Sequence, residues 1–164
     1  MAGGMALLPS CLRDAGKSSI ELKNIDVTLD QENLLADIAE TIIPETDTPG
    51  AKTLKLHLFL LKMLDDCHTE EEQKLFFKGL DALQDQADRD FSKSFAKMTP
   101  AERKQLLLSV EKNQKDGEAL TTWYGIMKRR TIGGYLNSKY VMSNLIKWEL
   151  VPGRYNGFYP VKTA

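Results

Sequence analysis

The chain has 164 residues, of which 42% are hydrophobic and 27% charged, with 11 Gly, 6 Pro and 2 Cys. This composition excludes a collagenous chain, a disulfide-stapled mini-protein and a wholly disordered chain, and the length fits one domain with a sizeable core. The net charge of −1 argues against a dedicated nucleic-acid binder, which needs a basic surface to displace counterions.

The N-terminal segment predicts export. Residues 1–11 are small and apolar and give way to a polar stretch, as at the end of a signal peptide's hydrophobic region. Leu8-Pro9-Ser10-Cys11 resembles a bacterial lipobox, in which Cys11 would carry the lipid. We therefore expect residues 1–27 to be an export-signal remnant and flexible tether, and the protein to be periplasmic and held at a membrane only through Cys11. The alternative is a flexible tail with an incidental thiol.

Helical signals begin directly after this segment. Thr28 offers an N-cap, and apolar residues then recur with the helical period up to Pro44, which ends the first helix. A turn with Asp47, Pro49 and Gly50 follows, and the next apolar run predicts a second helix over residues 51–67. No apolar run approaches the ~18 residues that a membrane span requires.

The second half of the chain continues in the same way. Thr69 begins a capping box with Glu72 and predicts a long third helix to about Phe91. Thr99-Pro100-Ala101-Glu102 combines an N-cap, a proline at the first helical position and a reciprocal glutamate, and it starts a fourth helix. A fifth helix is expected over residues 118–129 and a short sixth over 138–145.

Two glycines, Gly133 and Gly134, are expected to break the fifth helix in a turn. No segment has the period-2 alternation of a strand. The tail from Leu150 to Pro160 is rich in Pro and Gly and cannot be helical. The prediction is therefore an all-α, single-domain bundle of about five to six helices, spanning residues 28–164, with a Pro/Gly-rich aromatic C-terminal tail.

Catalytic motifs are missing from the sequence. It contains no glycine-rich dinucleotide or phosphate loop, no haem attachment motif and no nucleophile elbow. The one tempting group is Asp65-Asp66-Cys67-His68 with His57 upstream, but on one helix residues 57 and 68 stand roughly 16 Å apart, too far to share a metal ion. We therefore expect solvated aspartates, a packed thiol at Cys67, and no catalytic, metal-binding or cofactor-binding residue in this chain.

Charge and aromatic residues are unevenly distributed. Residues 28–90 carry 15 acidic and 6 basic residues, whereas residues 91–164 carry 13 basic and 5 acidic residues. Ten of the 13 aromatic residues lie at or beyond Phe91. Either the acidic helices neutralise the basic ones within the monomer, or the molecule presents a charged face to a partner. The aromatic residues in turn either fill the core or anchor an interface, where Tyr, Trp, Phe and Arg are enriched.

Three stretches together resemble the gluconate 2-dehydrogenase subunit 3 family. They are Ile42-Ile-Pro-Glu-Thr-Asp-Thr-Pro-Gly-Ala51, Thr99-Pro-Ala-Glu-Arg103, and Thr131-Ile-Gly-Gly-Tyr-Leu-Asn-Ser138 followed by Pro152-Gly-Arg-Tyr-Asn-Gly157. The resemblance implies a small helical subunit that accompanies an FAD-dependent dehydrogenase of the glucose-methanol-choline type, with a cytochrome c as a further candidate subunit. It implies that FAD sits in the partner, that this chain is not the catalytic one, and that it assists export, folding or stability of the flavoprotein.

The resemblance and the aromatic residues together give a predicted partner-binding surface made of two turns, one helix and the tail. Its members are Pro44, Asp47, Pro49, Gly50, Trp123, Tyr124, Thr131, Gly133, Tyr135, Arg154, Tyr155, Phe158 and Tyr159. Two other functions stay open at this stage. One is an independent metal-dependent enzyme built on Asp65 and His68, and the other is a lipid-anchored scaffold that binds a peptide or small ligand.

Overall fold

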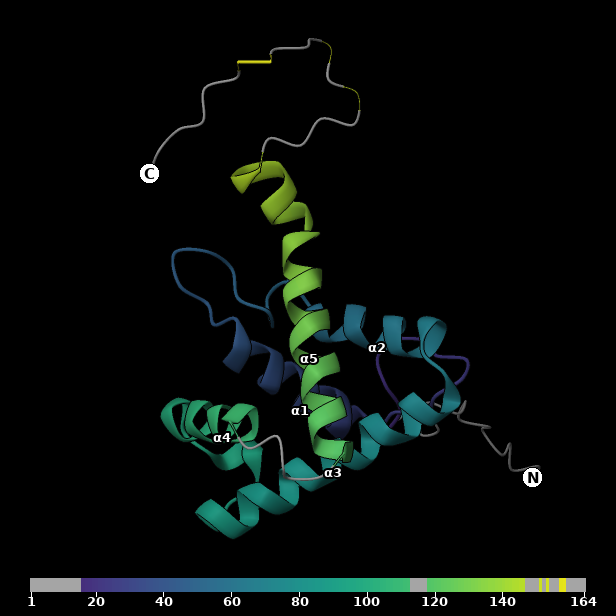
Figure 1. Ribbon diagram of the computed structural model, residues 1–164, viewed down its shortest axis with the longest axis vertical. Coiled ribbons are helices and arrows are strands. Elements are labelled where there is room, and N and C mark those ends of the chain that lie inside the picture. Colours follow the sequence, from purple (N-terminus) through teal and green to yellow (C-terminus); the bar gives the residue numbers. More distant parts are fainter. Residues whose placement is uncertain (1–15, 113–117, 147–150, 152, 154–156, 159–164) are drawn as a thin grey trace, which may run out of the picture.

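The protein is all-α. A computed structural model describes residues 16–112, 118–146, 151, 153, 157 and 158 (Figure 1). The helices are α1 (Leu29–Ile42), α2 (Leu56–Cys67), α3 (Glu70–Phe91), α4 (Pro100–Lys112) and α5 (Glu118–Leu136), with a short 3₁₀ turn η1 (Phe95–Lys97) and a π turn η2 (Val141–Leu145). Within the described residues the only β pairing is an isolated bridge between Lys17 and Thr28. The predicted single-domain bundle of five to six helices is confirmed.

The predicted helix starts are confirmed where a capping box marks them. The Thr28 hydroxyl accepts from the Gln31 backbone N–H at 3.2 Å, and the Gln31 side chain accepts from the Thr28 N–H at 3.0 Å. Thr69 and Glu72 repeat this reciprocal pair at the start of α3. Thr99 and Glu102 do so at the start of α4. Each pair satisfies backbone donors that a helix leaves unpaired in its first turn.

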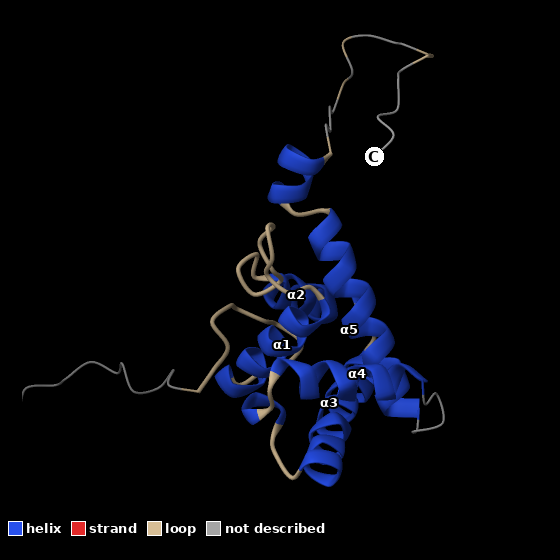
Figure 2. Cartoon of the chain, turned by 90° about the vertical axis from the view of Figure 1, so that its left-hand side faces the viewer, coloured by secondary structure: helices blue, strands red, loops and turns tan. Residues whose placement is uncertain are grey.

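The core lies where α5 crosses α3 and α2 (Figures 1 and 2). Trp123 of α5 and Phe76 of α3 are fully buried there, with ring centroids 6.4 Å apart. Gly79 of α3 allows the close approach, because an added Cβ would stand 2.3 Å from the Trp123 Cβ and 2.4 Å from the Ala119 carbonyl oxygen. Leucines of α2 and α3 complete the core: Leu60, Leu61, Leu64, Leu80 and Leu83.

Two predicted helix boundaries are wrong. The second helix begins at Leu56 rather than at residue 51, because residues 51–55 form turns and Lys55 has a left-handed backbone (φ 53°). The fifth helix does not break at Gly133 and Gly134 but continues to Leu136. A glycine costs a helix only about 1 kcal/mol, and Gly134 packs against Phe59 of α2, whose Cδ1 would lie 2.8 Å from an added Cβ. Tertiary packing thus outweighs the local preference.

The N-terminal segment is also packed more extensively than predicted. Ile25 and Val27 are buried in the core, and Ile20 and Leu22 pack against it. Residues 16–27 therefore belong to the folded domain rather than to a flexible tether. Cys11 lies outside the described residues. Among the described helices, none has both the length and the apolar character needed to cross a membrane.

Candidate docking surface

The loop between α1 and α2 is organised by one carboxylate. Glu40 of α1 accepts the backbone N–H of Glu45 through Oε1 and that of Lys52 through Oε2, both at 2.8 Å. Gly50 is required at this point, because an added Cβ would stand 2.5 Å from both Glu40 Oε1 and the Glu45 nitrogen. The loop is thereby held in shape, with Pro44 and Asp47 exposed on its outer side.

This loop lies against the C-terminal half of α5. The Tyr135 hydroxyl donates to the Thr48 hydroxyl oxygen at 3.2 Å, which joins two positions 87 residues apart in the sequence. Pro49 and Tyr135 are both half-buried. The turn around Asp47 and the segment around Tyr135 were both predicted to bind a partner, and this hydrogen bond shows that they lie side by side. The segment around Tyr135 is, however, part of a helix and not a turn.

The end of α5 and the short turn η2 that follows it project beyond the helical body (Figures 1 and 2). Three large apolar side chains on these elements are exposed: Leu136 at the end of α5 is 50% exposed, Leu145 of η2 55% and Ile146 46%. Phe158 is 95% exposed. We call Leu136, Leu145 and Ile146 the apolar arm. Large apolar side chains exposed on a projecting element are typical of a surface that another protein covers.

Several residues that were predicted to bind a partner do not lie on the exposed surface of the loop or the apolar arm. Trp123 and Thr131 are fully buried, and Gly50 is buried beneath its loop, so these three residues act in the core and in the loop, not on the surface. Gly133 and Tyr124 are half-buried on α5. Arg154, Tyr155 and Tyr159 lie outside the described residues. The arm residues Leu136, Leu145 and Ile146 were missed, because single leucines and isoleucines in a helical pattern indicate core.

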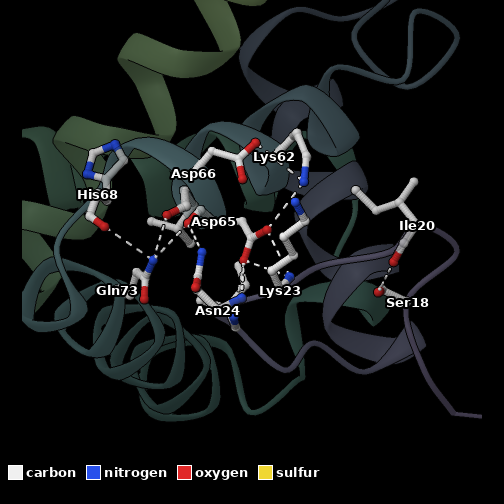
Figure 3. A network of polar contacts seen from close by, with 11 residues as sticks. Ser18, Ile20, Lys23, Asn24, Lys62, Asp65, Asp66, His68 and Gln73 are labelled. Carbon is white, nitrogen blue, oxygen red and sulfur yellow. Dashed lines mark hydrogen bonds and ion pairs between the residues drawn. The ribbon is translucent and has the colours of Figure 1, made fainter.

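The residues of the metal-site alternative are engaged in a structural network (Figure 3). Asp65 is buried, contrary to the prediction of a solvated side chain, and its carboxylate accepts the backbone N–H groups of Lys23, Asn24 and Ile25 at 2.6–3.2 Å. Burial alone would raise the pKa of Asp65, but these backbone donors and the Lys62 ammonium hold it below its ordinary value. Asp65 thus fastens the N-terminal segment to α2.

His68 is engaged as well. A nitrogen of the Arg130 guanidinium lies 3.0 Å from His68 Nε2, and since a guanidinium only donates, Nε2 accepts and the proton sits on Nδ1, 3.2 Å from a Glu72 carboxylate oxygen. The Gln73 amide donates to the Leu64 and His68 carbonyl oxygens and so satisfies backbone acceptors at the C-terminal end of α2. Within the described parts of the chain, no three His, Cys, Asp or Glu side chains gather as a metal site would require. Cys67, predicted to be packed, is an exposed free thiol.

The sequence of the chain matches the family described as gluconate 2-dehydrogenase subunit 3 over residues 29–153. That match covers well over half of the chain, from the start of α1 past the apolar arm. The chain belongs to the gluconate 2-dehydrogenase subunit 3 family. No curated protein and no solved structure matches it. Membership of the subunit 3 family makes this chain one component of a dehydrogenase complex, and the α1–α2 loop and the apolar arm both lie inside the matched region.

Proposed function

We propose that this chain is the non-catalytic small subunit of a periplasmic dehydrogenase, and that it binds an FAD-dependent catalytic subunit of the glucose-methanol-choline type that oxidises a sugar, sugar acid or polyol. The observation that carries the proposal is membership of a family defined as a dehydrogenase subunit. In this proposal the flavin sits in the partner, and a cytochrome c subunit receives the electrons. The small subunit assists export, folding or stability of the flavoprotein, and a lipid on Cys11 holds it at the membrane.

The apolar arm supports binding of a partner. Leu136, Leu145 and Ile146 each expose about half of their surface on an element that projects from the body. Covering apolar surface in an interface yields roughly 25 cal/mol per Å², so a few such side chains account for much of the binding energy at the centre of an interface. The α1–α2 loop, which a hydrogen bond from Tyr135 to Thr48 joins to the end of α5, adds the exposed residues Pro44 and Asp47.

Co-purification tests this proposal. The tagged chain is expressed together with an FAD-dependent large subunit of the glucose-methanol-choline type, and we expect the two to be recovered together. Leu136→Glu and Leu145→Glu, made separately, should each reduce recovery at least roughly tenfold, since each places a charge in an apolar contact. Leu29→Glu is the matched control, because Leu29 is also exposed but lies in the first turn of α1, where an acidic residue suits the helix dipole.

Two outcomes contradict the proposal. One is that the wild-type chain recovers no flavoprotein. The other is that Leu29→Glu and the two arm variants lower recovery equally, which would show that the arm has no special part in binding. Far-ultraviolet circular dichroism of each variant establishes that the helices remain folded. The same preparations tested for lipid on Cys11 by mass spectrometry decide the proposed anchor.

A further inference from the structure

A second open surface lies between the outer faces of α4 and α5. A groove of about 430 Å³ is lined by Val110 and Glu111 of α4 and by Tyr124, Gly125, Arg129 and Ile132 of α5, among others. A second hollow of about 400 Å³ lies on α4 itself and includes Lys104, Leu108 and Lys112 in its lining. We call the two together the α4–α5 groove. Ile132 and Leu108 are 38% and 44% exposed, so the groove offers apolar contacts that nothing in the described chain covers.

Gly125 gives this groove its depth. Gly79 and Gly134 are glycines because α3 and α5, or α5 and α2, pack too closely for a Cβ. Gly125 has no such reason, since an added Cβ would meet no atom within 4 Å. A glycine inside a helix costs about 1 kcal/mol relative to alanine. The fold therefore carries a cost at Gly125, as it does at the equally open Gly133, that packing among the described residues does not explain. At Gly125 the open space belongs to the groove, where it has room for a side chain inserted from outside.

The side chains around the groove include positive charges that are exposed to a partner. Lys104, Lys112 and Arg129 are exposed and form no ion pair within the part of the chain that the structure describes. Glu111 is already neutralised, because it pairs with the Lys128 ammonium and accepts from the Tyr124 hydroxyl at 3.0 Å. A partner helix would therefore meet three cations that have no ion-pair partner among the described residues.

Ion pairs among the described residues do little to neutralise the charge asymmetry of the sequence. Among the described residues, a single ion pair joins the acidic residues 28–90 to the basic residues 91–164, namely Arg103–Asp37 at 3.2 Å. The other ion pairs lie within one half or the other. Of the basic half, Lys104, Lys112 and Arg129 are exposed at the groove, which favours an acidic partner.

We propose that the α4–α5 groove binds an acidic amphipathic helix of the dehydrogenase partner, whose apolar side chains enter the hollow above Gly125 and contact Ile132 and Leu108 while its carboxylates pair with Arg129 and Lys112. The concave shape suits a helix laid into a groove rather than a flat lipid surface. This inference rests on the proposed function, but it places a second contact away from the apolar arm.

A defined peptide tests the groove directly. The probe is a synthetic helical peptide of about 15 residues with leucines at i, i+4 and i+7 and glutamates on its flanks. Its matched control replaces every glutamate with lysine. Binding is followed by two-dimensional NMR of the labelled protein, in which the Gly125 amide reports occupation of the groove. We expect the acidic peptide to shift the Gly125 and Ile132 signals and to bind more weakly as salt increases, and the basic peptide to shift neither.

Two variants act on different features of the groove. Lys112→Glu/Arg129→Glu reverses its free charge and should weaken binding of the acidic peptide roughly tenfold or more. Lys17→Glu/Lys78→Glu makes the same change in net charge at exposed lysines that do not line the groove, and should leave binding within about twofold. Gly125→Leu fills the hollow without meeting the rest of the chain and should abolish binding while retaining the fold.

The proposal is overturned if the basic peptide binds equally well, if both charge-reversal pairs weaken binding to the same extent, or if Gly125→Leu has no effect. It is also overturned if vesicles containing an anionic phospholipid, rather than the peptide, shift the Gly125 signal. The co-purification assay separates the two proposals. If Lys112→Glu/Arg129→Glu still recovers the flavoprotein as efficiently as wild type does, the groove is not part of that contact and the proposed function stands.

Discussion

Replacing Asp65 with asparagine should detach the N-terminal segment from α2. The carboxylate accepts backbone N–H groups of Lys23 at 3.0 and 3.1 Å, of Asn24 at 2.6 Å and of Ile25 at 3.2 Å. Asparagine keeps one acceptor oxygen but turns an NH₂ group toward a backbone donor. Hydrogen bonds to a charged group contribute about 1.5–3 kcal/mol each, so we expect Asp65→Asn to lower the free energy of unfolding by about 2–4 kcal/mol.

Urea denaturation followed by helical circular dichroism measures this loss. The matched control is Asp66→Asn. Asp66 is an exposed neighbour that pairs with Lys62 at 3.3 Å, and its substitution should cost less than about 1 kcal/mol. The pH dependence gives a second check. Since the pKa of Asp65 is lowered in the folded state, its stabilisation is present above the ordinary aspartate pKa of about 4 and is lost as the pH falls through the lower folded value.

The difference in stability between wild type and Asp65→Asn should therefore be constant from about pH 5 to 8 and narrow below about pH 4. A loss no larger than that of Asp66→Asn, or a difference that does not change in acid, would refute the assignment of Asp65 as a buried anchor.

Three further predictions follow from the helical glycines, Tyr124 and the α1–α2 loop. Gly79→Ala should destabilise the fold by about 1–3 kcal/mol, because the added Cβ meets Trp123. Gly125→Ala adds a Cβ that meets nothing and should stabilise the fold by up to about 1 kcal/mol. Urea denaturation that gives both substitutions a change of the same sign in the free energy of unfolding would contradict this. Burial and the Glu111 carboxylate raise the pKa of Tyr124 to about 12. Glu111→Gln should move that pKa toward 10, and a spectrophotometric titration unchanged by the substitution would disprove the contact. Tyr135→Phe removes the hydrogen bond to Thr48 and should cost about 0.5–1.5 kcal/mol while hydrogen exchange in residues 44–50 increases; unchanged exchange would show that Tyr135 does not hold the loop.

Local signals in the sequence predict the helix starts well. Thr28, Thr69 and Thr99 each begin a helix because the capping interaction is complete within four residues and needs no tertiary partner. The break predicted at Gly133 and Gly134 fails for the opposite reason. Its outcome depends on Phe59, which lies some 75 residues earlier in the chain and packs against Gly134.

The functional surfaces also combine features that neighbouring residues determine with features that depend on residues far apart in the chain. The motif around Asp47 and the motif around Tyr135 can be recognised in the sequence, but their contact through Thr48 is a consequence of how α5 crosses the bundle. The sequence predicts a solvated Asp65, because the three backbone N–H groups that bind its carboxylate come from residues some 40 positions earlier in the chain. The depth of the α4–α5 groove at Gly125 likewise depends on two helices at once and has no sequence signature.

Recovery of flavin with the tagged chain tests most directly whether this chain is a non-catalytic subunit that binds a flavoprotein. The chain is co-expressed with the proposed FAD-dependent large subunit and purified through its tag. The visible absorbance of bound flavin is then recorded together with sugar and polyol oxidation. The account predicts that flavin and activity accompany the complex and that the isolated small subunit has neither. A purified small subunit that carries flavin and oxidises the substrate alone, or a tagged chain that never recovers a flavoprotein, would contradict it.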